Sequence, residues 1–128
     1  VTLTMTVTGT TTCTNQSRAT YTIYVDPIPQ ANTNGSATIC QNTSYTLTNG
    51  QATSAYGAIS WTENGQGSIT SGLNSLTPTY TANAADAGNT VTLTMTVTST
   101  NNCASQSTTS TFDVHVDPLP VATGSGSA

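Results

Sequence analysis

The chain contains no lysine, and Arg18 is the single basic residue among its 128 residues. The missing lysine excludes Schiff-base catalysis and the Lys–Asn isopeptide bonds that stiffen some surface modules. The formal net charge is −4, so the chain cannot neutralise a phosphate backbone, and we expect no nucleic-acid binding. The same shortage of positive charge argues against anionic membrane surfaces. No apolar run approaches the roughly 20 residues that span a bilayer, so we expect no membrane insertion.

Residues that carry catalysis or bind metals are equally scarce. His115 is the only histidine, and no Gly-x-Ser-x-Gly nucleophile motif is present. Asp113, His115 and Asp117 alternate along one stretch and would share a strand face, where a metal site could form. The corresponding residues of an internal repeat, described below, are Thr22, Tyr24 and Asp26, so two of the three ligands are replaced. We therefore interpret this face as exposed polar surface. We expect no enzyme, no catalytic residues, no cofactor and no metal.

Threonine is abundant, at about a quarter of the chain, and charged residues are 5%, compared with roughly 25% in typical soluble domains. Because threonine is β-branched and favours extended backbone, this composition predicts an all-β protein coated with hydroxyl and amide groups. The clearest element is the segment 91–98, VTLTMTVT, in which apolar residues alternate with threonine. Such alternation is typical of a strand with one packed face and one solvated face.

The same eight letters open the chain at residues 1–8, and the similarity continues beyond them. Cys13 aligns with Cys103, and after one inserted residue the segment 21–29, YTIYVDPIP, aligns with 112–120, FDVHVDPLP. The period of about 90 residues suits tandem β-sandwich domains of near 100 residues. We expect residues 1–26 to be the last two strands of a truncated module and 27–35 to be a proline-containing linker. We expect 36–117 to be a complete module and 118–128 to be a linker and the start of the next module.

Seven short strands separated by turn residues are predicted within the complete module. They lie at 36–40, 44–48, 56–62, 68–70, 76–82, 90–98 and 108–116. Residues 83–88 are expected to form one helical turn that crosses between sheets, with Asp86 capping this turn rather than binding calcium. The predicted core consists of Trp61, Tyr80, Val91, Leu93, Met95 and Val97.

Several segments of the complete module, taken in order, resemble the PKD-like (immunoglobulin-like) repeats of secreted, gliding-associated surface adhesins of Bacteroidota. The resemblance is carried by ATIC at 37–40, WTENGQG at 61–67, TYTANAADAG at 79–88, VTLT at 91–94, Asn102-Cys103 and DPLP at 117–120. It covers residues 36–120, and residues 1–29 match the final third of the same pattern. The resemblance implies a seven-stranded immunoglobulin/PKD-like β-sandwich in a tandem array with a spacer or adhesive role. It brings no catalytic residues.

The three cysteines leave one unpaired in a chain expected to be secreted. Cys40 and Cys103 belong to one module, so we expect a disulfide between them. Cys13 would then pair with a missing part of the preceding module. The alternatives are a Cys13–Cys40 bridge and a link through Cys13 to another chain.

Three functions remain open. The first is an extracellular, structural or adhesive repeat that forms a stalk or filament at the cell surface. The second is a carbohydrate-binding module of a secreted protein, for which Tyr24 and Tyr56 are the candidate exposed aromatics. The third is a self-assembling fibre subunit that completes its fold by strand exchange. The expected partners are neighbouring copies of the repeat, together with surface glycans or other cells.

Overall fold

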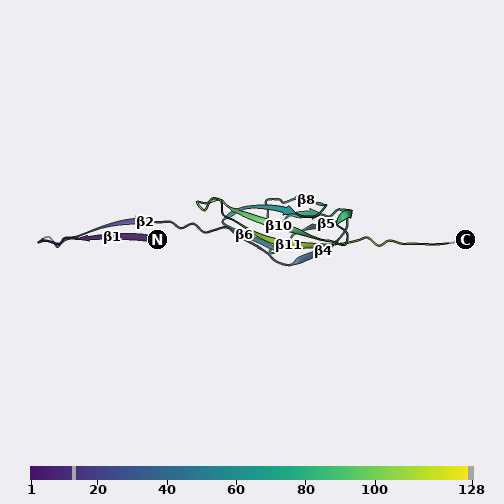
Figure 1. Cartoon of the computed structure of the whole chain (residues 1–128), viewed down its shortest axis with the longest axis horizontal. Coiled ribbons are helices and arrows are strands. Elements are labelled where there is room, and N and C mark those ends of the chain that lie inside the picture. The colour runs from purple at the N-terminus through teal and green to yellow at the C-terminus, as the bar shows by residue number, and fades with distance from the viewer. Residues whose placement is uncertain (13, 127–128) are drawn as a thin grey trace.

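The computed structural model describes residues 1–12 and 14–126, and within them the chain is all-β apart from one short 3₁₀ helix. Residues 127 and 128, in the segment expected to begin another module, lie outside the described residues. The strands are β1 (Thr2–Thr8), β2 (Gln16–Thr22), β3 (Gln30–Thr33), β4 (Ser36–Cys40), β5 (Ser44–Thr46), β6 (Ala52–Ala55), β7 (Gly57–Glu63), β8 (Ser68–Ser71), β9 (Thr79–Thr81), β10 (Thr90–Ser99) and β11 (Ser107–Asp117), and the helix is η1 (Ala84–Asp86). A two-stranded hairpin, a sandwich-like body and a terminal tail follow one another along the long axis (Figure 1).

The body consists of a four-stranded sheet and two smaller sheets. The large sheet has the order β4-β11-β10-β7, in which β4 is parallel to β11 and the other neighbours are antiparallel. The smaller sheets are β3-β6 and β5-β9-β8. Because residues from the large sheet and from the smaller sheets share one buried cluster, the body is a β-sandwich with its core between the layers.

Alternation along β10 and β11 builds one side of this core. In β10 the apolar residues of the VTLTMTVT stretch are at most 2% exposed, whereas its threonines lie on the opposite face. In β11 Phe112, Val114 and Val116 are buried in the same way, and the ring of Phe112 stacks on that of Tyr45 at a centroid distance of 5.9 Å. The buried apolar residues are Leu47, Ala52, Trp61, Tyr80, Ala82, Val91, Leu93, Met95, Val97, Phe112, Val114 and Val116.

The glycines of the segment 61–67 allow the turn after β7 to approach the core closely. A Cβ atom on Gly67 would lie 2.2 Å from the carbonyl oxygen of Thr81 and 2.6 Å from the hydroxyl of Tyr80. A Cβ on Gly65 would lie 2.5 Å from the same hydroxyl. This turn therefore requires residues without side chains, which gives the Gly-Gln-Gly motif a packing role.

Two strands of the body have no counterpart among the seven expected from the sequence. Strand β3 lies within the segment 27–35 expected to be a linker, and it pairs with β6 in an antiparallel ladder. Their sequences, QANT and ATSA, contain only small and polar residues. Without large apolar residues they show no period-two hydrophobic pattern, so their pairing is set by the tertiary fold.

Candidate functional site

The most unusual surface belongs to the β1–β2 hairpin, in which every residue of the two strands is exposed. Its apolar side chains line one side of the two strands, and we call this set the hairpin face. The exposed fractions of these side chains run from 39% for Ile23 to 74% for Val1. The hairpin face comprises Val1, Leu3, Met5, Val7, Tyr21 and Ile23. A two-stranded hairpin with one bare apolar side is marginally stable by itself in water.

The hairpin pairs in the same register as β10 and β11. Leu3 faces Tyr21 and Met5 faces Ala19 in the first hairpin. In the second, Leu93 faces Phe112 and Met95 faces Ser110. Every pair of the first hairpin maps onto a pair of the second when 90 is added in β1 and 91 in β2, so the inserted residue falls in the loop.

The surroundings of the two hairpins differ. In the sandwich, β10 has β7 as its outer neighbour and β11 has β4, and the smaller sheets cover the apolar face. Among the residues that the structure describes, β1 and β2 pair only with each other. The hairpin face therefore has the residue pattern of a core surface, but within residues 1–12 and 14–126 it has neither a covering layer nor neighbouring strands.

The linker after β2 is attached to the loop between β10 and β11. The backbone N–H and the side-chain amide of Asn102 donate to one carboxylate oxygen of Asp26, at 3.2 and 2.8 Å. The side-chain amide of Asn101 donates to the carbonyl oxygen of Pro27 at 2.9 Å, and the Cys103 thiol donates to that of Asp26 at 3.5 Å. Pro29, just before β3, is buried.

A buried carboxylate closes the other end of the sandwich. Asp86 is 2% exposed, and its carboxylate accepts hydrogen bonds from the Tyr80 hydroxyl at 2.7 Å and from the backbone N–H groups of Gln66 and Asn83 at 2.6 and 2.8 Å. Asn83 caps the 3₁₀ helix and forms a capping box with Asp86.

These hydrogen bonds set the ionisation of both side chains. Burial alone would raise the pKa of the Asp86 carboxyl, but the bonds from Gln66, Asn83 and Tyr80 outweigh it, and the pKa lies below its ordinary value. Burial and the bond to Asp86 raise the pKa of the Tyr80 phenol well above its usual range. The carboxylate is satisfied within the protein and has a structural role as the cap of the crossing turn.

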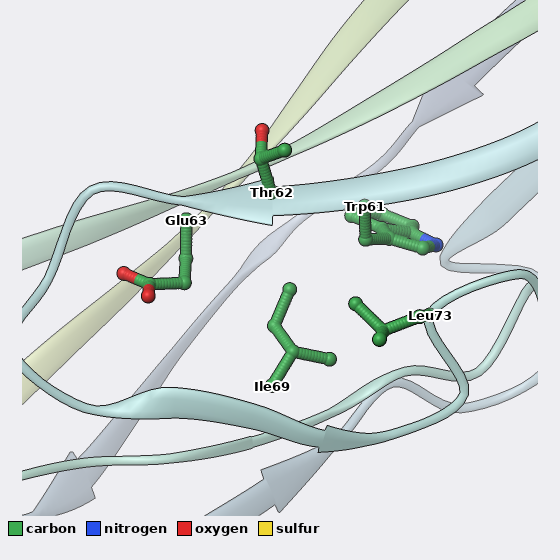
Figure 2. A pocket seen from close by; sticks show the side chains of 5 residues that line it. All are labelled: Trp61, Thr62, Glu63, Ile69 and Leu73. Carbon is green, nitrogen blue, oxygen red and sulfur yellow. The ribbon is translucent and has the colours of Figure 1, made fainter.

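An open hollow of about 300 Å³ lies between β7 and β8, lined by Trp61, Thr62, Glu63, Ile69 and Leu73. Figure 2 shows Ile69 and Leu73 pointing into it beneath the strand that carries Trp61 and Glu63. Trp61 is 3% exposed, and its indole N–H donates to the carbonyl oxygen of Ser75 at 2.8 Å. The ring is thus a core element and does not offer a face on which a sugar could stack.

Asp113, His115 and Asp117 lie on one exposed face of β11. The imidazole Nε2 of His115 is 3.3 Å from the Asp117 carboxylate, and its Nδ1 is 3.2 Å from the Thr90 hydroxyl. Asp113 instead accepts from the Thr92 hydroxyl at 2.9 Å. Within residues 1–12 and 14–126, no group of three histidine, cysteine or acidic side chains is arranged to hold a metal ion.

The structure corrects the expected Cys40–Cys103 disulfide, because both thiols are free. Cys40 pairs with Asp117 at the end of β11, whereas Cys103 lies in the loop before β11 begins. Strand β11 spans 11 residues between them. At roughly 3.3 Å per residue this separates the two cysteines by about 35 Å, and a disulfide needs Cα atoms within about 7 Å. The expected pairing of Cys13 lies outside the described residues.

The exposed tyrosines considered for sugar binding are 89% exposed at Tyr24 and 52% at Tyr56. Tyr24 precedes the linker, and Tyr56 lies in the turn before β7, at the end of the sandwich where Gly57 pairs with Ser99.

Sequence reasoning did not identify Asn101 and Asn102 as linker contacts. Their partners lie more than 70 residues away in the chain, and no local pattern marks such a pair.

No helix within the described part of the chain is long and apolar enough to cross a membrane. Comparisons with protein families, with characterised proteins and with solved structures found no match to this chain.

Proposed function

We propose that this chain is part of an extracellular tandem array of immunoglobulin-like β-sandwich modules that forms a stalk or filament of a bacterial surface protein. Residues 1–26 are the last two strands of one module in this array, and residues 30–117 form the next. The surface of hydroxyl and amide groups, with 5% charged residues, suits an exposed spacer without chemistry of its own. The resemblance to PKD-like repeats of Bacteroidota adhesins points to the same role.

The observation that carries this proposal is the shared register of the two hairpins. Sequence repetition alone can arise from low complexity, but here each cross-strand pair of β1 and β2 has its counterpart in β10 and β11. Side chains that form the hairpin face occupy the positions that are buried in the sandwich. A surface with this pattern needs a covering layer like that formed by the sheets β3-β6 and β5-β9-β8.

The strand order supports an immunoglobulin-like topology. Strands β7, β10 and β11 take the places of strands C, F and G, with β4 as a parallel edge strand beside G. In the covering layer, β9 and β8 take the places of E and D, and β3 takes the place of A. Strand B is divided in two, with β5 paired to β9 and β6 paired to β3.

The path of the chain supports an end-to-end arrangement. The linker enters the sandwich at the end that carries the β10–β11 loop, and the tail leaves at the opposite end (Figure 1). The loop of the β1–β2 hairpin also points away from the tail (Figure 1). Modules connected in this way extend along one axis, with an advance of roughly 35–45 Å per module from strands of 8–9 residues and the linker.

Strand exchange between neighbours is the second candidate, because the unpaired edges and the hairpin face could equally be covered by another copy of the chain. The two proposals differ in concentration dependence. A covering layer within the same chain buries the hairpin face at any protein concentration, whereas strand exchange requires two chains to associate.

A chain with a completed first module provides the test. Residues 29–90 are placed directly before Val1, because Val1 corresponds to Val91, and this chain is compared with the original by small-angle X-ray scattering. The array predicts a monomer whose maximum dimension increases by at most one module length, roughly 40 Å. It also predicts a first module that unfolds cooperatively. A completed chain that associates, or a first module that stays unfolded, would contradict the proposal.

A further inference from the structure

We infer that Asn101, Asn102 and Cys103 form a receptor for the Asp26-Pro27 segment, and that this contact sets the angle between a module and the linker that precedes it. We call this set of residues the linker clamp. The clamp is present within this chain. Its role in orienting the module that precedes the linker rests on the proposed function.

Each polar group of the clamp has a matching partner. The Asp26 carboxylate takes two hydrogen bonds from one residue, Asn102, and such a fork fixes direction as well as distance. The carbonyl groups of Asp26 and Pro27 accept from Cys103 and Asn101. The clamp therefore holds the backbone on both sides of the Asp-Pro bond.

Proline explains why the bound segment is a good ligand. Pro27 and Pro29 restrict their own backbone and that of the preceding residues to extended forms, so little conformational entropy is lost on docking. Burial of Pro29 holds the segment at its other end, directly before β3. A proline-rich linker alone is a semi-rigid spacer with no defined direction, and the clamp supplies that direction.

Hydrogen bonds within the β10–β11 loop orient its side chains for this contact. The Asn101 side-chain oxygen accepts from the backbone N–H of Cys103 at 2.9 Å and from the Ser99 hydroxyl at 2.7 Å. Its amide group is thereby oriented toward Pro27. The first copy has Thr11 and Thr12 at the positions of Asn101 and Asn102, and a hydroxyl donates a single hydrogen bond. The clamp is thus a property of this loop rather than of the repeat in general.

The thiol of Cys103 reports on the clamp. In a Cys13→Ser, Cys40→Ser background, Cys103 is the only thiol, and its rate of alkylation by iodoacetamide follows opening of the contact. Asp26→Ala removes the carboxylate acceptor, and we expect alkylation to be about fivefold faster because hydrogen bonds to a charged group are lost. Asn102→Asp places a second carboxylate beside that of Asp26, and the repulsion between them should accelerate alkylation of Cys103 by a similar factor.

The matched control is Asp117→Ala, which alters the same Val-Asp-Pro motif at the opposite end of the sandwich and should leave the rate unchanged. Fluorescence of Trp61 establishes that each variant is folded. Exchange of the Asn102 amide hydrogen, measured by NMR, should increase in Asp26→Ala as well. An increase in alkylation smaller than about threefold, or an equal increase in Asp117→Ala, would overturn the inference. Neither result depends on whether an upstream layer covers the hairpin face, so failure here is distinguishable from failure of the array.

Discussion

The hairpins β1–β2 and β10–β11 begin with the same eight residues and pair in the same register, but one is exposed and the other forms half of a core. Met95 is fully buried, whereas its counterpart Met5 is 62% exposed. The local sequence is sufficient for the strand and its pairing in both places. Burial depends on the rest of the module, which supplies neighbouring strands at both edges and a second layer. A strand of this kind presents one apolar face, and its stability depends on the layer that packs against that face.

The largest expected effect comes from removing the same side chain in each hairpin. Leu93→Ala should lower the free energy of unfolding of the sandwich by about 3 kcal/mol, because a fully buried leucine leaves a cavity. Leu3→Ala should change it by less than about 0.5 kcal/mol, since Leu3 is 52% exposed. Urea denaturation followed by the fluorescence of Trp61 measures both. Equal losses in the two variants would show that the hairpin face is already packed.

A smaller loss of stability is expected from changing Asp86, which caps the turn at one end of the sandwich. This cap belongs to the sandwich and not to the β1–β2 hairpin. Asp86→Asn should lower the free energy of unfolding by about 2 kcal/mol near neutral pH, because an amide group then meets three donors. The control is Asp113→Asn, an exposed carboxyl with one hydrogen-bond partner, which should have little effect.

The effect of Asp86 should depend on pH in a defined direction. The folded-state pKa of this carboxyl is depressed, so its contribution is present above the unfolded-state pKa, near 4, and is lost as the pH falls through the folded-state value. The difference between the parent chain and Asp86→Asn should therefore narrow below about pH 4. A difference that is constant from pH 7 to pH 2 would contradict this account of the cap.

The smallest effect concerns the threonine faces, on which the two hairpins are most alike. Thr94 is half-buried beside Thr111 and Thr62, so Thr94→Ala should lower the free energy of unfolding by about 0.5 kcal/mol through lost cross-strand contacts. Thr4→Ala should have no measurable effect on the sandwich. Calorimetric melting of both variants provides the comparison, and a large loss from Thr94→Ala would show that the outer face is also packed.

How well each strand can be predicted from the sequence depends on how regularly its apolar and polar residues alternate. Strict alternation of apolar residues with threonine is enough to define β10 and the side of it that faces the core. Strands β3 and β6 could not be recognised, because small polar residues pair there only once the rest of the sandwich is in place. The disulfide was wrongly expected, since membership of one module does not reveal that two cysteines lie at opposite ends of a strand.

The central claim is that the hairpin face is a core surface whose covering layer lies elsewhere in a tandem array, and the two methionines test it directly. Met5 and Met95 are equivalent residues of the repeat and the only methionines in the chain. Hydrogen peroxide oxidises accessible methionine to the sulfoxide, and mass spectrometry resolves the two sites. In the original chain at low concentration, we predict rapid oxidation of Met5 and protection of Met95. In the chain with residues 29–90 placed before Val1, we predict that Met5 becomes as protected as Met95. Continued rapid oxidation of Met5 in that completed chain would contradict the account.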